Sequence, residues 1–106
     1  MRFKGSMYFT GSALPDCPVT EAVITKTRVS IDGTEDGYLG HLDADSPDGL
    51  QFQGNFGYRG YRDPNPSYLF ELRRSQSQQD VLLFGTWRDL EKGESGMWVF
   101  VLTPET

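Results

Sequence analysis

The densest run of apolar side chains in the chain lies between Val81 and Leu102. Within it, Glu91-Lys92-Gly93 fits a three-residue loop that ends on a left-handed glycine, which predicts a β-hairpin with Leu90 opposite Glu94. Because side chains alternate along a strand, this register divides the hairpin into two faces. One face would carry Leu82, Phe84, Thr86, Trp98, Phe100 and Leu102, and the other Val81, Leu83, Gly85, Trp87, Met97, Val99 and Val101.

Both faces of this predicted hairpin are apolar, and this constrains the rest of the chain. An antiparallel sheet with one side in water is apolar at every second position only. Burial of each large apolar side chain contributes roughly 1.5 to 3 kcal/mol, so we expect neither face to stay in water. One face must pack on the core, and the other must be covered by the chain itself, by a second copy of the hairpin or by a ligand.

Tyr38 to Tyr58 is predicted to form a second hairpin, with only one apolar face. Ser46-Pro47-Asp48-Gly49 is typical of a type I turn with glycine in the left-handed position, which places Ser46 opposite Leu50. The inner face would carry Tyr38, Leu42, Ala44, Phe52, Phe56 and Tyr58, and the outer face His41, Asp43, Asp45, Gln51, Gln53 and Asn55.

Three further segments alternate in the manner of strands, namely Arg2 to Phe9, Val19 to Ile31 and Ser67 to Arg74. Gly11 to Pro18 is expected to be a loop, because its two prolines cannot donate to a sheet ladder. Ser75 to Asp80 is expected to be a polar turn. Residues 1–106 are thus predicted to form a single all-β domain of about seven antiparallel strands in a meander, closed into a small barrel or folded into a sandwich.

Length, charge and cysteine content narrow the class of protein. With 106 residues, of which 37% are hydrophobic, the chain can bury one core. Its formal net charge of −5 repels a phosphate backbone, so nucleic acid is not an expected partner. The single cysteine, Cys17, favours a reducing compartment. No apolar run is long enough for a signal peptide or a membrane span, so we expect a cytoplasmic protein with no membrane partner.

The residues that could carry chemistry form no catalytic pattern. The run from Asp43 to Gly49 has the alternating carboxylates of a calcium loop, but it lacks a closing glutamate, and the predicted turn accounts for Asp48 without a metal. His41 is the only histidine, and a pair between it and Cys17 is the one nucleophilic alternative left open. We therefore predict no catalytic residue, no metal site and no cofactor.

A candidate binding loop follows the second hairpin. Gly57 to Arg62 interleaves tyrosine with arginine, a composition suited to stacking on bases or sugars. The alternative is that these tyrosines fold back onto the end of the barrel. The residues predicted to bind a ligand or partner are therefore Trp98, Phe100 and Phe84 on the hairpin and Tyr58, Tyr61, Arg59 and Arg62 in this loop.

Gly85-Thr86-Trp87 resembles the Gly-x-Trp of lipocalins and the Gly-Thr-Trp of avidin-like barrels. Those families are up-and-down barrels that hold small apolar ligands, so the resemblance implies a barrel with a cavity. In them the motif opens the first strand, whereas here it lies in the next-to-last predicted strand. The resemblance covers three residues and adds weight only to the hypothesis of a small apolar ligand.

Three functions follow as hypotheses. The first is a non-catalytic binding or assembly module, in its simplest form a homodimer that self-associates through the hairpin from Val81 to Leu102. The second is a lipocalin-like or avidin-like barrel that binds a small apolar ligand with the same aromatic side chains. The third is an enzyme, which the shortage of histidine and cysteine disfavours.

Overall fold

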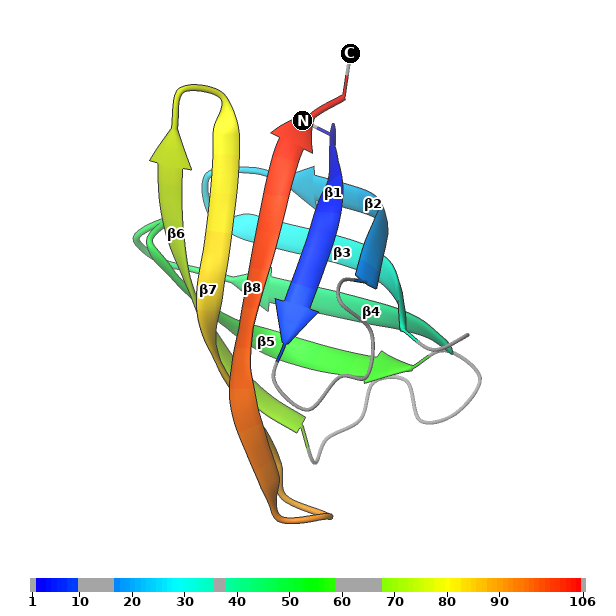
Figure 1. Cartoon of the computed structure of the whole chain (residues 1–106). Helices are drawn as coiled ribbons and strands as arrows, with labels where there is room; N and C mark the ends of the chain where they lie inside the picture. The colour runs from blue at the N-terminus through cyan, green and yellow to red at the C-terminus, as the bar shows by residue number, and fades with distance from the viewer. Residues whose placement is uncertain (1, 10–16, 36–37, 59–67, 106) are drawn as a thin grey trace.

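The computed structural model describes residues 2–9, 17–35, 38–58 and 68–105, with residues 35, 38, 58, 68 and 77 described by their backbone alone. Within this part of the chain there are eight antiparallel strands (Figure 1). No segment of it forms a helix long and apolar enough to cross a membrane. In chain order the strands are β1 (Arg2–Phe9), β2 (Cys17–Ile24), β3 (Arg28–Glu35), β4 (Tyr38–Asp45), β5 (Gln51–Tyr58), β6 (Tyr68–Ser77), β7 (Asp80–Asp89) and β8 (Glu94–Pro104).

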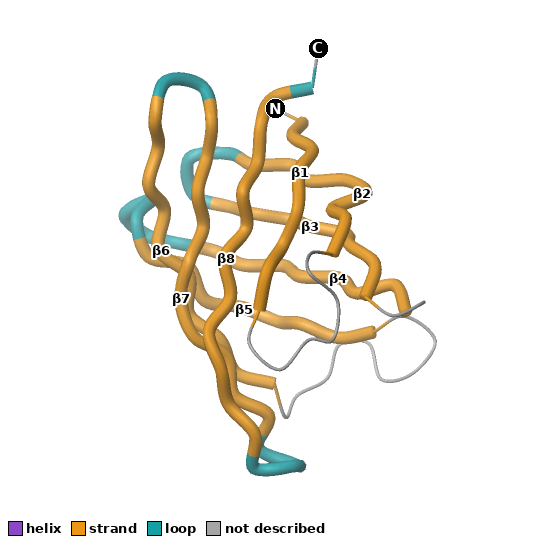
Figure 2. The backbone as a smooth tube through the Cα atoms, in the orientation of Figure 1, coloured by secondary structure: helices purple, strands orange, loops and turns teal. Residues whose placement is uncertain are grey.

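Each strand pairs with the next along the chain, and β1 also pairs with β8, so the sheet closes into a barrel (Figure 2). The closing ladder runs from Phe3 opposite Pro104 to Phe9 opposite Trp98. Closure satisfies the backbone of the first and last strands, which would otherwise be the edges of an open sheet. The predicted all-β antiparallel meander is confirmed, and it is a barrel rather than a sandwich.

The eighth strand is present because the predicted strand from Val19 to Ile31 is a hairpin. The strands β2 and β3 are joined by a turn between Ile24 and Arg28. In this turn Thr25 Oγ1 accepts a hydrogen bond from Arg28 N at 3.1 Å, and Thr25 N donates to Arg28 O at 2.8 Å. The turn residues continue the alternation of the flanking strands. The sequence pattern therefore does not show that the chain reverses direction here. The strand β2 also includes Cys17 and Pro18, which the sequence had placed in a loop.

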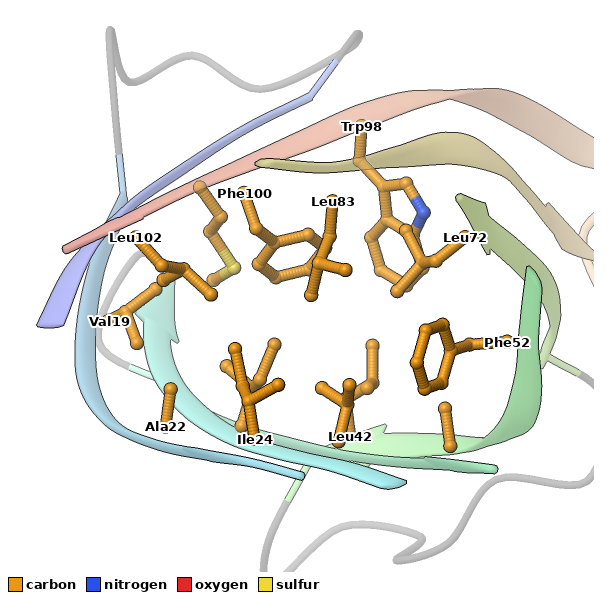
Figure 3. Packing of buried hydrophobic residues seen from close by; sticks show 14 of the residues in the cluster. Val19, Ala22, Ile24, Leu42, Phe52, Leu72, Leu83, Trp98, Phe100 and Leu102 are labelled. Atoms are coloured by element: carbon orange, nitrogen blue, oxygen red, sulfur yellow. The ribbon is translucent and has the colours of Figure 1, made fainter. Parts of the chain in front are cut away.

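The inward side chains of the barrel fill its interior with apolar groups (Figure 3). An eight-stranded barrel is wide enough either for side chains to fill it or for one small ligand. The buried hydrophobic residues come from all eight strands and are Phe3, Met7, Cys17, Val19, Ala22, Ile24, Val29, Ile31, Leu42, Ala44, Phe52, Phe56, Phe70, Leu72, Val81, Leu83, Trp98, Phe100 and Leu102. This cluster is the core of the domain.

The hairpin of β7 and β8 has a turn one residue longer than predicted. Asp89, not Leu90, lies opposite Glu94. The Asp89 carboxylate accepts hydrogen bonds from the backbone N–H groups of Glu91 (3.0 Å) and Lys92 (3.3 Å), which makes it the cap of a four-residue turn. The predicted left-handed glycine is confirmed, since Gly93 has a φ of 72°.

This shift of one residue corrects the predicted faces of the hairpin. A shift of one moves the side chains of one strand to the opposite face relative to the other strand. Trp98 and Phe100 therefore face inward together with Leu83, which lies opposite Phe100. Phe84, predicted to share their face, points outward and is 37% exposed.

The hairpin of β4 and β5 also has a longer turn, but here the predicted faces are confirmed. Asp45 lies opposite Gln53 and Leu42 lies opposite Phe56, a displacement of two residues from the predicted register. Because side chains repeat every two residues, a shift of two leaves each one on its face. Of the predicted inner residues whose side chains are described, all are buried, namely Leu42, Ala44, Phe52 and Phe56.

The corrected register can be tested with two phenylalanines on neighbouring strands. We expect Phe100→Ala to lower the free energy of unfolding by about 3 to 5 kcal/mol, because it leaves a cavity in the core. We expect Phe84→Ala to lower it by about 1 kcal/mol or less, since that ring is partly in water already. Urea unfolding at low micromolar protein concentration measures both. Similar losses in the two variants would contradict this register.

Candidate functional site

The middle of the outer face of the C-terminal hairpin is largely apolar and exposed in a single copy of the chain. The exposed side chains are Met97 (62% exposed), Val101 (42%), Leu82 (37%) and Phe84 (37%). On β1, Tyr8 is 43% exposed and lies opposite Val99. We call this surface the outer patch, and it consists of Tyr8, Leu82, Phe84, Met97, Val99 and Val101.

The outer patch is continuous across three neighbouring strands. On β8, Val99 lies between Tyr8 of β1 and Phe84 of β7, because it is paired with both. In the same way Val101 is paired with Leu82 of β7. The strands β1, β8 and β7 lie side by side on one side of the barrel (Figure 1). Directly opposed side chains in a sheet lie in contact distance, so these residues form one surface rather than scattered exposed groups.

The other side of the barrel, formed by the outer faces of β2 to β5, is polar and largely acidic. Its outward residues include Glu21, Ser30, Asp32, His41, Asp43, Asp45, Gln53 and Asn55, with Val23 and Leu39 as apolar members. Arg28 lies 4.0 Å from Asp43 and 3.9 Å from Asp45, and so offsets part of the negative charge. The barrel thus has an apolar side and an acidic side.

The structure separates the residues that the sequence predicted to act together on the hairpin. Trp98 (6% exposed) and Phe100 (1%) belong to the core, whereas Phe84 belongs to the outer patch. A role of Trp98 and Phe100 in binding is therefore a role inside the barrel. Sequence reasoning also placed Met97 and Val101 on the face away from Phe84, because it used the register that the structure corrects.

The predicted binding loop lies mostly outside the described residues. Tyr58 is the last residue of β5, and its backbone lies opposite Gly40. Arg59, Tyr61 and Arg62 are not among the residues that the structure describes. Binding through these four side chains stays a prediction.

Trp98 is the centre of an aromatic cluster inside the barrel. Its ring makes edge-to-face contacts with Phe100 (5.2 Å between ring centroids), Phe70 (5.4 Å) and Phe56 (5.6 Å). Gly85 lies opposite Trp98, and a Cβ at Gly85 would come within 1.9 Å of the Glu71 carbonyl oxygen, so this position has to be glycine. The inward alternation of Phe56 and Phe70 could be predicted from sequence, but their convergence on Trp98 could not.

His41 is held between two carboxylates on the acidic side. Its Nδ1 lies 2.5 Å from Asp32 Oδ1, and its Nε2 lies 2.7 Å from Asp43 Oδ2. Partial burial is the largest single influence and opposes the charged ring, but the hydrogen bonds and negative charges of the two aspartates together raise the pKa of His41 above 6.5. Since both ring nitrogens are engaged, His41 is a structural bridge between β3 and β4 and is poorly placed to be a general base.

Cys17 does not complete a catalytic pair. Its side chain is buried at 1% exposure on the inner side of β2, whereas His41 contacts aspartates on the outer side of the barrel. A reactive thiol requires access and a neighbour that stabilises the thiolate. The Cys17 and His41 pair left open by the sequence is therefore contradicted by the geometry.

The acidic turn after β4 is organised by hydrogen bonds. Asp48 Oδ1 accepts from the backbone N–H groups of Leu50 (2.9 Å) and Gln51 (3.1 Å) and from the Ser46 hydroxyl (2.8 Å). These bonds, that of Leu50 first, hold the pKa of Asp48 below its ordinary value. Throughout the described ranges, no group of three or more His, Cys, Asp or Glu side chains is placed to hold a metal ion.

An open depression of about 670 Å³ lies at the barrel end where this turn meets the turns after β2 and β6. Its polar side chains connect the turns to one another. Arg74 donates from Nη1 to the Thr25 carbonyl oxygen (3.2 Å) and from Nη2 to Gln76 Oε1 (3.1 Å). Its backbone N–H donates to the Leu50 carbonyl oxygen at 2.9 Å. We interpret this depression as a structural junction.

Comparison of the chain with models of protein families, with curated proteins and with solved structures gave no match. The outer patch and the aromatic cluster are the features of the molecule that bear on its function.

The bridge at His41 predicts a pH-dependent stability. Because the folded-state pKa is raised above the ordinary 6.5, the stabilisation is fully present below about pH 6.5 and is lost as pH rises through the raised value. As the only histidine of the chain, His41 gives a single imidazole signal in an NMR titration, which measures this pKa directly.

The control for this prediction is His41→Gln, whose free energy of unfolding should not fall across the same pH window. Asp32→Asn or Asp43→Asn should lower the pKa of His41. A His41 pKa below 6.5, or an unchanged pH dependence in His41→Gln, would contradict the bridge.

Proposed function

We propose that this protein is a non-catalytic binding and assembly module that forms a homodimer through the outer patch. The observation that carries the proposal is the continuous apolar surface that β1, β7 and β8 expose in a single copy. Monomeric soluble proteins seldom leave their large apolar side chains gathered on one side of a sheet. Association removes these side chains from water.

The shape and the composition of the outer patch favour a second copy as its occupant. A twofold dimer brings the same surface of each copy together, so the surface must be complementary to itself. The outer patch meets this condition, because it has no charged member and two such surfaces can pack like the layers of a sandwich. Lys4 of β1 and Arg88 of β7 are exposed near its ends. The neighbouring strand β6 carries charges of both signs, Glu71 opposite Thr86 and Arg73 opposite Phe84. These side chains can form ion pairs between the two copies at the rim of the interface.

The distribution of charge supports the same arrangement. The net charge of −5 makes two copies repel one another at long range. The acidic residues Asp32, Asp43 and Asp45 lie on the other side of the barrel from the outer patch. Dimerisation through the outer patch therefore turns the acidic sides away from each other and into solvent.

Two expectations from the sequence accompany this proposal. A reducing compartment, such as the cytoplasm, suits a chain whose single cysteine is buried. Small-molecule binding within the barrel is the second candidate function, and it is favoured by the buried indole N–H groups of Trp87 and Trp98, which have no acceptor among the described residues.

The homodimer can be tested by sedimentation equilibrium and by size-exclusion chromatography with light scattering. We expect the wild-type chain to dimerise and Leu82→Asp to weaken the dimer at least tenfold, because a carboxylate would then be desolvated in the interface. Met97→Asp should act in the same direction.

The matched control is Val23→Asp, because Val23 on β2 is 36% exposed, as Leu82 is 37% exposed, but lies outside the outer patch. Its dimerisation constant should equal that of the wild type. A wild-type chain that stays monomeric at all concentrations, or an equal effect of Val23→Asp, would refute the proposal.

A further inference from the structure

Both tryptophans of the chain have a buried indole N–H group with no acceptor. Trp87 Nε1 and Trp98 Nε1 are inaccessible to solvent, and no hydrogen-bond partner lies near either of them in the structure as described. The whole Trp98 side chain is buried, with 6% exposure. Buried donors in proteins are nearly always satisfied, so two donors without an acceptor among the described residues indicate a partner outside this part of the chain.

The two indoles are neighbours inside the barrel. Trp98 lies opposite Gly85 and Trp87 lies opposite Gly96, so the tryptophans are diagonal neighbours on β7 and β8. Phe70 connects them, because its backbone is paired with Trp87 and its ring is 5.4 Å from that of Trp98. The surrounding rings are weak acceptors and do not replace an oxygen atom.

The backbone ladder between neighbouring strands is shortest beside this site, although Gln53 Nε2 of β5 still donates a hydrogen bond to Glu71 Oε1 of β6 at 3.3 Å beyond the last pair. The strands β5 and β6 are paired only at Gln51 with Arg73 and at Phe52 with Leu72, whereas every other neighbouring pair of strands has five or more paired positions. The ladder between β5 and β6 ends before Phe56 and Phe70, whose rings contact Trp98. Figure 3 shows the indole nitrogen of Trp98 turned away from the middle of the core, toward this side of the barrel.

The scarcity of charged groups in the interior limits the class of ligand that could bind there. Of the residues described, the buried polar or charged ones are Ser46 and Asp89. The Asp89 carboxylate already caps the turn after β7, and no buried cation is available there to balance an anion. A charged ligand would therefore lose its hydration without gaining a counter-ion.

We infer that the barrel binds a small, uncharged, largely apolar molecule between β5 and β6, with a carbonyl-type oxygen that accepts hydrogen bonds from Trp98 Nε1 and Trp87 Nε1. The rings of Phe56 and Phe70 contact the apolar part of this molecule. The inference does not depend on the homodimer, because both indoles face the interior and the outer patch faces solvent.

The experiment uses two probes of nearly the same shape, acetophenone and α-methylstyrene, which differ in having C=O or C=CH2. The two tryptophans give two indole N–H signals in a ¹H–¹⁵N NMR spectrum. We expect acetophenone to shift both signals to saturation and to bind about tenfold more tightly than α-methylstyrene, the order of a hydrogen bond to a neutral acceptor.

Two variants locate the binding. Trp98→Phe keeps an aromatic ring but removes the donor, so the preference for acetophenone should fall toward equality, while Phe84→Leu on the outer patch should leave it unchanged. If Trp98→Phe does not fold, the wild-type comparison of the two probes still decides. Equal affinities, or no saturable shift of the indole signals with either probe, would overturn the inference.

Discussion

The pairing of β1 with β8 determines where every side chain of the C-terminal hairpin lies. With β1 on one side and β7 on the other, β8 is paired along both of its edges from Trp98 to Leu102. One face of the hairpin must then point into the barrel and the other must point out. The inward residues of all the strands form the core. The outward residues of β7 and β8 are also apolar, and together with Tyr8 of β1 they form the outer patch.

The turns determine which apolar residues point outward. At the end of β7, Asp89 caps a four-residue turn, whereas the sequence pattern suggested a three-residue turn that starts one position later. After β4, Asp48 caps a turn that is also longer than predicted, but by an even number of paired positions. The predicted inner and outer residues are therefore confirmed in the hairpin of β4 and β5. They are wrong in the hairpin of β7 and β8, where the register shifts by one residue. Residue types alone did not reveal which side chain would cap the turn.

The same limits apply to the candidate site. The alternation of residues was enough to predict an all-β meander and a hairpin that could not be solvated on either face. It could not predict the turn at Thr25, because threonine fits a strand as well as it fits this turn. The convergence of Phe56, Phe70 and Trp98 depends on three strands that are distant in sequence. The short ladder between β5 and β6 could not be predicted either, because alternation along a strand does not show where its pairing with a neighbour ends.

The two proposals concern opposite faces of one hairpin, and they are compatible in the same molecule. On β8, Met97 contributes to the outer patch and the next residue, Trp98, contributes its indole to the interior. The outer patch spans β7, β8 and β1, whereas the interrupted ladder lies between β5 and β6. A second copy seated on the outer patch would cover the strands that carry the indoles without covering the pair of strands between which the ligand is proposed to bind. Alternation along a strand is what allows a short hairpin to serve both purposes.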